Sequence, residues 1–114
     1  MSPTDPSTTP QPFYRIDRFV VPQAVRAEFI GRVRMTHEVL RQQPGFIQDM
    51  LVEQPAGPGQ SKIITIVEWR DVSATDGARA AVAAMYSREN FSAQTFIAER
   101  GIDADFGNYQ PLGV

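Results

Sequence analysis

The segment that most constrains the fold runs from Ile63 to Trp69 (Ile-Ile-Thr-Ile-Val-Glu-Trp) and follows the turn Pro44-Gly45-Phe46. β-Branched residues occupy every position from Ile63 to Val67, which predicts a strand. The strand ends on a tryptophan, whose large ring and indole N–H suit the wall of a small-molecule pocket. The order of elements around this strand therefore decides the fold.

The region before the turn predicts a strand followed by a helix. Residues Phe13 to Val21 are rich in aromatic and β-branched side chains, as in a strand buried on both faces. Pro22 suits the first turn of a helix, because its missing N–H is not needed there. Apolar residues then recur at helical spacing up to Leu40, and the helix must end before Pro44.

After the turn, two strands should form a hairpin. The first is Phe46 to Glu53, in which Gln48 and Asp49 interrupt the apolar residues, and the second is Ser61 to Arg70. The Pro- and Gly-rich stretch 55–59 predicts the connecting loop.

The last third predicts two helices and a fourth strand. Ser73 and Asp76 resemble a capping box that opens a helix through Ala78 to Tyr86. Its packing face would be Ala78, Val82, Met85 and Tyr86. Ser92 should cap a shorter helix that Gly101 ends, and Asp103 to Tyr109 is the natural fourth strand. The order β-α-β-β-α-(α)-β predicts the α+β class: a ferredoxin-like split βαβ with a four-stranded antiparallel sheet and helices on one face.

Composition limits the chain to one domain, expected over residues 13–114, behind a flexible N-terminal tail of residues 1–12 that holds four prolines. Eleven basic and thirteen acidic residues give a net charge of −2 without a basic stripe, so no nucleic-acid partner is expected. No cysteine is present, which excludes disulfides and zinc–thiolate sites. No apolar run is long enough to span a bilayer and no signal peptide is visible, so neither membrane association nor export is expected and the predicted location is cytoplasmic.

The strands are apolar on both faces, as in Phe19-Val20-Val21 and Met50-Leu51-Val52. Helices can cover only one face of such a sheet, and a monomer would expose a large apolar patch. Two sheets packed face to face bury that patch. We therefore expect a homodimer.

Three segments carry a resemblance: Val21-Pro22 at the first helix, Gln43-Pro44-Gly45-Phe46, and Ile66-Val67-Glu68-Trp69. Together they resemble the antibiotic biosynthesis monooxygenase family of the dimeric α+β barrel superfamily. The resemblance implies a homodimer with a pocket between sheet and helices in each subunit. Some members of the family oxidise polycyclic aromatic compounds with O2 and no cofactor, others degrade haem, and many have no known activity.

The resemblance makes Trp69 a candidate pocket residue, and the alternative is a plain core role. Thr65 lies on the same strand face as Trp69, because strand side chains alternate. Cofactor-free family members carry a polar amide near the position of Thr65, so threonine departs from the family. Asp17 is a carboxylate within the first strand and would be a candidate base if it is buried. The alternative for Asp17 is an ion pair with Arg15, Arg18 or a cross-strand arginine.

His37 is the only histidine, and it is either a candidate base or a residue at the boundary of the first helix's apolar face. Haem-degrading relatives carry an axial histidine where this chain has Arg79, so haem degradation is not expected. With no second histidine, no metal site is expected. No dinucleotide-binding motif is present either, and we expect no bound cofactor.

Two functions remain open on these grounds. The first is a cofactor-independent monooxygenase that acts with O2 on a small aromatic or polyketide-like phenolic substrate. The second is a non-catalytic, small-ligand-binding or stress-related dimer of the same fold. For the first, the candidate catalytic residues are Asp17, His37 and Trp69, and the candidate substrate-binding residues are Phe19, Phe29, Thr65, Val67, Arg79, Met85 and Tyr86.

Overall fold

A computed structural model describes residues 11–113 of the chain. The predicted tail lies mostly outside the described residues, and Gln11 and Pro12 form no regular secondary structure. Four strands and three α-helices follow: β1 (Phe13–Pro22), α1 (Arg26–Arg41), β2 (Phe46–Pro55), β3 (Gln60–Trp69), α2 (Ala74–Arg88), α3 (Ala93–Glu99) and β4 (Asp103–Tyr109).

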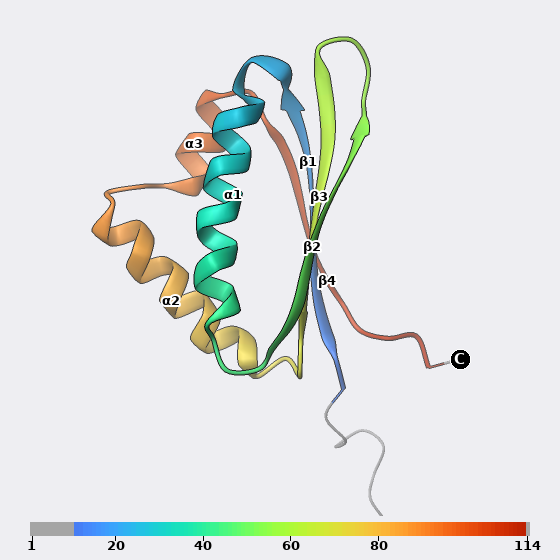
Figure 1. Ribbon diagram of the computed structural model, residues 1–114, viewed down its shortest axis with the longest axis vertical. Helices are drawn as coiled ribbons and strands as arrows, with labels where there is room; N and C mark the ends of the chain where they lie inside the picture. Colours follow the sequence, from blue (N-terminus) through green and yellow to red (C-terminus); the bar gives the residue numbers. More distant parts are fainter. Residues whose placement is uncertain (1–10, 114) are drawn as a thin grey trace, which may run out of the picture.

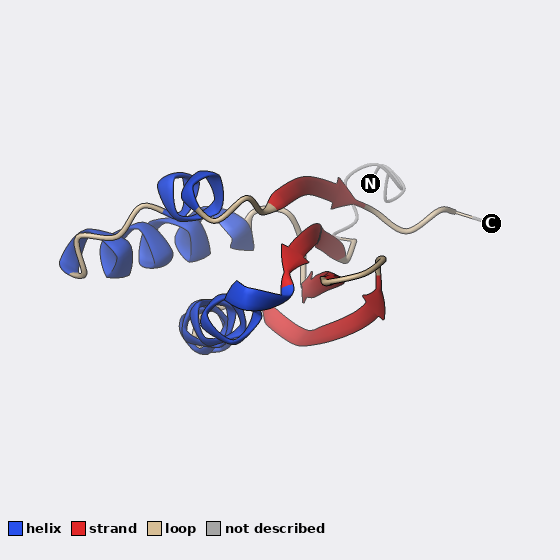
Figure 2. Cartoon of the chain, turned by 90° about the horizontal axis from the view of Figure 1, so that it is seen from above, coloured by secondary structure: helices blue, strands red, loops and turns tan. Residues whose placement is uncertain are grey.

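The strands form one antiparallel sheet in the order β2-β3-β1-β4. All three helices lie on the same side of this sheet (Figures 1 and 2). This is the ferredoxin-like α+β arrangement, and the predicted fold class is confirmed. The two central strands, β1 and β3, lie side by side, and their register pairs Asp17 with Thr65.

Two details of the helix starts differ from prediction. Pro22 ends β1, and a 3-10 turn, Gln23–Val25, precedes α1. Ser73 makes no capping hydrogen bond to α2; instead, its backbone N–H and its hydroxyl both donate to the Asp71 carboxylate. The predicted cap of α3 is confirmed, because the Ser92 side chain accepts a hydrogen bond from the backbone N–H of Thr95.

Odd-numbered residues of β1 and β3 face the helices and form the core in two separate clusters. An upper cluster joins Phe19, Val21, Phe29, Ile63, Phe96 and Ile102. A lower cluster joins Phe13, Val67, Trp69 and Ala78. Between them, on the same face of the sheet, lie the polar residues Asp17 and Thr65.

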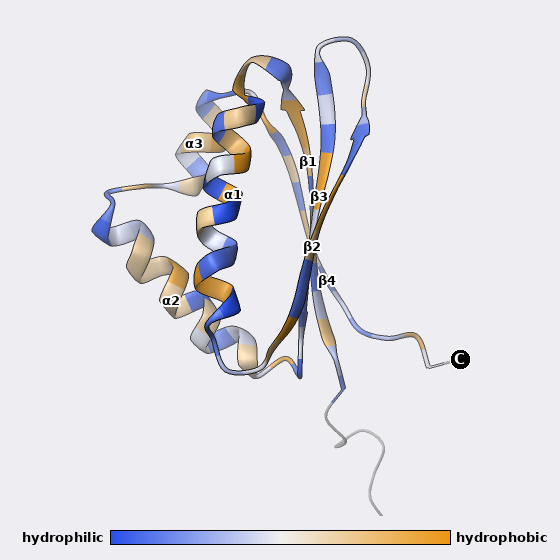
Figure 3. Cartoon of the chain, in the orientation of Figure 1, coloured by the Kyte–Doolittle hydropathy of each residue, from blue (hydrophilic) through white to orange (hydrophobic). Residues whose placement is uncertain are grey.

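Even-numbered residues of β1 and β3 lie on the opposite face of the sheet. No helix covers that face (Figures 1 and 3). Ile16 pairs with Ile66, and Ile66 pairs with Met50, so one apolar row crosses three strands. Next to it, Ile64 pairs with Val52. Met50 and Val52 are 50% and 41% exposed. This outer face is therefore an open apolar surface in the single chain.

The turn between α1 and β2 depends on Gly45, which has a φ of +89°. Its carbonyl accepts a hydrogen bond of 2.7 Å from the backbone N–H of Arg70, which ties the turn to the end of β3. A Cβ atom at Gly45 would lie 2.5 Å from the Cβ of Ala74. Glycine is required here by both backbone conformation and space.

We therefore expect Gly45→Ala to destabilise the chain by about 3 kcal/mol or more, because a steric clash adds to the cost of the left-handed conformation. Gly59→Ala is the matched control: Gly59 has a φ of +72° but no atom within 4 Å of the added Cβ. It should cost only about 1–2 kcal/mol. Urea unfolding of both variants measures the difference, and equal losses would contradict the steric argument.

Candidate active site

A cavity of about 280 Å³ lies between the sheet and the helices. It occupies the gap between the two core clusters, at the level of the Asp17–Thr65 pair. Its walls are mostly aromatic and aliphatic, with a small number of polar groups, as in many small-molecule sites. The lining residues are Arg15, Asp17, Phe19, Phe29, Arg32, Val33, Thr36, His37, Thr65, Tyr86, Phe91, Ala93, Phe96, Ile97 and Phe106.

Asp17 lies on the sheet side of the cavity and is paired with Arg15. The Nε atom of Arg15 donates to Oδ1 of Asp17 at 2.6 Å. The Asp17 side chain is 17% exposed, and its burial raises the pKa of the carboxyl despite the opposing effect of Arg15. The structure thus shows the ion pair that was the alternative for Asp17, and the raised pKa keeps the carboxylate a candidate base.

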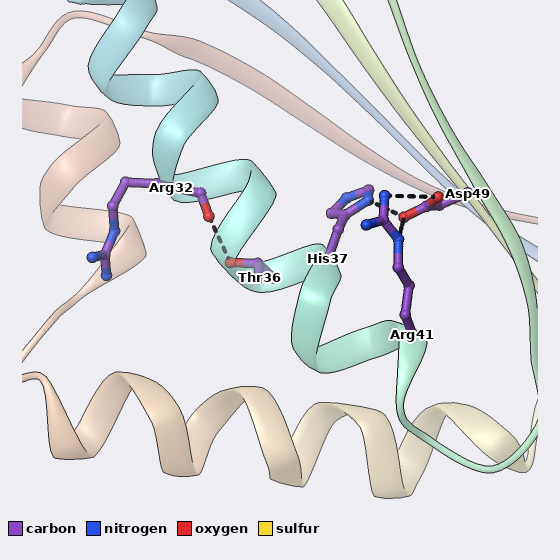
Figure 4. A network of polar contacts seen from close by, with 5 residues as sticks. All are labelled: Arg32, Thr36, His37, Arg41 and Asp49. Carbon is purple, nitrogen blue, oxygen red and sulfur yellow. Dashed lines mark hydrogen bonds and ion pairs between the residues drawn. The ribbon is translucent and has the colours of Figure 1, made fainter.

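His37 lies on α1 and is buried, with 5% of its surface exposed. Its Nδ1 atom lies 3.0 Å from Oδ2 of Asp49 on β2 (Figure 4). Arg41, one helical turn further along α1, donates to both oxygens of the same carboxylate at 2.9 and 3.2 Å. Asp49 therefore holds His37 from one side, while the imidazole ring lines the cavity.

The protonation of this pair follows from the charge on Asp49. Burial tends to raise the pKa of Asp49, but the hydrogen bonds from Arg41 and His37 outweigh it and hold the pKa below its ordinary value. An ionised carboxylate can only accept hydrogen bonds, so Nδ1 of His37 carries a proton, and in the neutral imidazole Nε2 is the nitrogen with the lone pair. Within residues 11–113, Nε2 makes no hydrogen bond to a side chain. It is free to accept a proton from a ligand.

The helix side of the cavity adds hydroxyl groups and a cation. The Thr36 hydroxyl and the Tyr86 hydroxyl are 2.9 Å apart. Thr36 also donates to the carbonyl oxygen of Arg32 at 3.1 Å (Figure 4). The Arg32 guanidinium lies over the Phe91 ring, 3.4 Å from its centroid.

The cavity brings together several of the residues predicted from sequence and leaves out others. Lining the cavity are Asp17, His37, Phe19, Phe29, Thr65 and Tyr86. Outside it are Trp69, Val67, Arg79 and Met85. Arg79 is exposed on α2, and Met85 is buried away from the cavity.

Trp69, a predicted pocket residue, lies outside the cavity because of its position along β3. Trp69 faces the helices, as alternation predicts, but it lies four residues beyond Thr65, about 13 Å away at about 3.3 Å per residue. There it packs in the lower core cluster, edge-on to Phe46 with ring centroids 5.8 Å apart. Its role in the structure is core packing.

Sequence reasoning missed the aromatic wall formed by Phe91, Phe96 and Phe106, and it missed Asp49. Asp49 looked like an interruption of an apolar strand. The sequence does contain a signal for Asp49: a single carboxylate within a strand, at a position that faces the helices. The same kind of signal identified Asp17 as a candidate site residue. Only the packing of α1 on β2 reveals that His37 and Asp49 are partners.

Residues 11–113 contain no cluster of three or more His, Asp or Glu side chains that could hold a metal ion. Among the same residues, no helix is both long and apolar enough to cross a membrane.

The chain is similar in fold to several solved structures. A mutant of SnoaB, a cofactor-independent oxygenase from Streptomyces nogalater, is 18% identical with a TM-score of 0.65, covering 91% of this chain and 96% of that one. A candidate antibiotic biosynthesis monooxygenase from Bacillus cereus is 15% identical with a TM-score of 0.56, covering 91% and 96%. A dimeric ferredoxin-like protein from an uncultured marine organism is 10% identical with a TM-score of 0.65, covering 91% and 98%.

The chain has the fold of antibiotic biosynthesis monooxygenases. No protein-family model matches its sequence, and no curated protein matches it. At identities of 10–18% the likeness extends to the fold, so the activity must be argued from the residues of the site.

We expect Asp49→Asn to destabilise the chain by about 1–2 kcal/mol at pH 7, because the hydrogen bonds from His37 and Arg41 lose their charged acceptor and Arg41 is half exposed. The folded-state pKa of Asp49 is lowered, so its contribution is complete above the unfolded value of 3.8. That contribution is lost as the pH falls through the lowered folded-state pKa.

The difference between wild type and Asp49→Asn should therefore shrink as the pH is lowered from 5 to 3, as measured by urea unfolding. Glu38→Gln, at an exposed position on α1 next to His37, should change stability by less than about 0.5 kcal/mol. A difference that stays constant with pH would contradict the assigned role of the ionised carboxylate.

Proposed function

We propose that the chain is a cofactor-independent monooxygenase that acts with O2 on a small phenolic aromatic compound. The observation that carries the proposal is His37, a buried histidine that Asp49 orients at 3.0 Å and that lines an otherwise largely aromatic cavity. The fold shared with SnoaB, a cofactor-independent oxygenase, supports the same reaction class.

In this reaction, His37 is the general base. Nε2 removes a proton from the substrate, and the ionised Asp49 stabilises the imidazolium that forms. The carbanion gives electrons to O2, and a C–O bond forms to make a hydroperoxide. The imidazolium of His37 gives its proton to the peroxide anion to complete the hydroperoxide. His37 then removes the remaining C–H proton while the O–O bond breaks, and passes that proton to the departing hydroxide to form water. One ring methylene of the keto tautomer and one molecule of O2 thus give one carbonyl and one molecule of water.

The cavity sets the size and polarity of the substrate. A volume of about 280 Å³ lies at the lower end of small-molecule sites, which suits one or two fused rings. Phe29, Phe91 and Phe96 supply aromatic surface for stacking. Because Thr36 donates to the Arg32 carbonyl, Tyr86 donates to Thr36, and the Tyr86 oxygen can accept a hydrogen bond from a phenolic O–H. A phenol of one or two rings therefore fits better than a large polycyclic compound.

Asp17 is the second candidate base. Burial raises the pKa of Asp17 and makes it a stronger base than an ordinary carboxylate, but its ion pair with Arg15 at 2.6 Å competes with a substrate for the carboxylate. His37, whose Nε2 is free of such a partner, is the better placed of the two.

The test is the oxidation of 1-naphthol to 1,4-naphthoquinone and water, followed by oxygen consumption and quinone absorbance. We expect one O2 consumed for each quinone formed by the wild type. His37→Gln, which can still hydrogen-bond Asp49, should lower kcat by at least about 100-fold. Asp17→Asn should retain most of the activity.

A large loss in Asp17→Asn with activity kept in His37→Gln would assign the base to Asp17 and overturn the mechanism. Binding of 1-naphthol without oxygen consumption, together with no turnover of other one- and two-ring phenols, would favour the second function, a small-ligand-binding protein.

The outer face supports a homodimer in which two sheets pack against each other. The row Ile16–Ile66–Met50 and the neighbouring Ile64 and Val52 make an apolar surface of the kind that such interfaces bury. One structure of similar fold is a dimeric ferredoxin-like protein. The dimer buries well over about 1,600 Å² in total, the size of a stable interface.

Sedimentation at micromolar concentration should show a dimer for the wild type. Ile66→Glu places a charge in the centre of the apolar row and should yield a monomer or a destabilised chain. Val72→Glu, at a 54% exposed residue in the loop after β3, is the control and should remain dimeric. A monomeric wild type would refute the proposal.

A further inference from the structure

Arg32 on α1 carries an unused pair of hydrogen-bond donors. Its Nη1 atom donates to Oε1 of Glu89 at 2.8 Å. Its Nε and Nη2 atoms are buried, and neither has a hydrogen-bond partner among residues 11–113. A guanidinium is always charged, and leaving its donors unpaired away from water is costly. Most buried polar groups are satisfied, so these two require an explanation.

In three other arginines, the edge of the guanidinium formed by Nε and Nη2 binds a carboxylate. Arg26 donates from Nε and Nη2 to the two oxygens of Glu53 at 2.6 and 2.7 Å. Arg41 binds Asp49 through the same pair of atoms, and Arg100 binds Glu28 through it at 2.9 and 3.0 Å. In each case the edge holds a carboxylate with two parallel hydrogen bonds. Arg32 has the same edge without the carboxylate.

Arg32 is one of the residues that line the ligand cavity. It also lines a second hollow of about 380 Å³ near the start of α3. Phe91 and Phe96 are shared by the two hollows. The Phe91 ring lies close enough to the guanidinium to stabilise its charge, but a ring face offers the edge no hydrogen-bond acceptor of normal strength.

The other two arginines near the cavity already use their Nε atom to bind a carboxylate of the chain. Arg15 is bound to Asp17, and Arg41, which reaches the site through Asp49, is bound to that carboxylate. Arg32 is bound to Glu89 through Nη1 alone. Arg32 is therefore the arginine at the cavity whose Nε–Nη2 edge holds no carboxylate among the described residues.

We propose that Arg32 binds a carboxylate of the ligand through Nε and Nη2, while the ring of the ligand occupies the aromatic cavity. The ligand class is an aromatic carboxylic acid of one or two rings. Both nitrogens are enclosed in the ligand-free chain, so binding requires the Phe91 side chain, on the link between α2 and α3, to turn away from the guanidinium. The inference deepens the proposed function, because it names the substrate class for the same cavity.

The experiment is calorimetric titration with 1-naphthoate and with 1-naphthamide, which has the same shape without the charge. We expect the wild type to bind the acid at least 10-fold more tightly than the amide. Arg32→Met keeps an unbranched apolar side chain and should abolish this preference, while the affinity for the amide changes by less than about threefold.

Two control variants separate ligand binding from structural effects. Glu89→Gln removes the ion pair to Nη1 but leaves the free edge intact, so the preference for the acid should persist or increase. Arg34→Met, at an exposed position of the same helix, should behave as the wild type does. Equal affinities for acid and amide in the wild type, or an unchanged preference in Arg32→Met, would overturn the inference. So would loss of the preference in Glu89→Gln.

The readout is independent of oxygen chemistry. Oxidation of 1-naphthol with no preference for 1-naphthoate would refute the carboxylate site and leave the proposed function standing. A preference for 1-naphthoate with no oxidation of any phenol would refute the oxygenase and leave the carboxylate site standing.

Discussion

The pairing of Asp17 with Thr65 across the two central strands is the constraint on which the site depends. Apart from Thr65, all helix-facing residues of β3 from Ile63 to Trp69 are apolar and buried. The polar pair divides the core into two clusters, and the helices close on those clusters without filling the space between them. The cavity lies at this level, where an apolar side chain packed over Asp17 would bury the carboxylate further and leave Arg15 as its side-chain partner.

The second organising contact is long-range and joins α1 to β2. His37 and Arg41 are four residues apart, so they share one face of the helix. Both reach the Asp49 carboxylate, one through a ring nitrogen and the other through its guanidinium. The arginine keeps Asp49 ionised, and the ionised Asp49 fixes the imidazole tautomer. The ion pair between Arg41 and Asp49 thus determines which nitrogen of a buried histidine faces the ligand.

The strands, their order and the faces of their side chains could be predicted from local patterns. β-Branched runs, the Pro44-Gly45 turn and simple alternation were sufficient to place Asp17 and Thr65 on one face of the sheet. The family resemblance indicated that this face lies under the helices. Depth along a strand could not be predicted, because it depends on where the helices cross the sheet. That is why Trp69 was expected at the pocket and lies in the lower cluster. The pairing of His37 with Asp49 was inaccessible for the same reason.

The inner face of α1 shows how the fold accommodates a site. Phe29 and Val33 continue the apolar stripe expected of a helix packed on a sheet, but Thr36 and His37 follow them on the cavity side. Each of these two polar side chains has a hydrogen-bond partner on a neighbouring element: Thr36 bonds to Tyr86, and His37 bonds to Asp49. Arg32 is the exception, since its ion pair with Glu89 leaves two buried donors unmet. Sequences depart from packing rules mainly where function requires it. Arg32, with two buried donors that lack a partner among the described residues, is therefore the residue from which a ligand's chemistry can best be inferred.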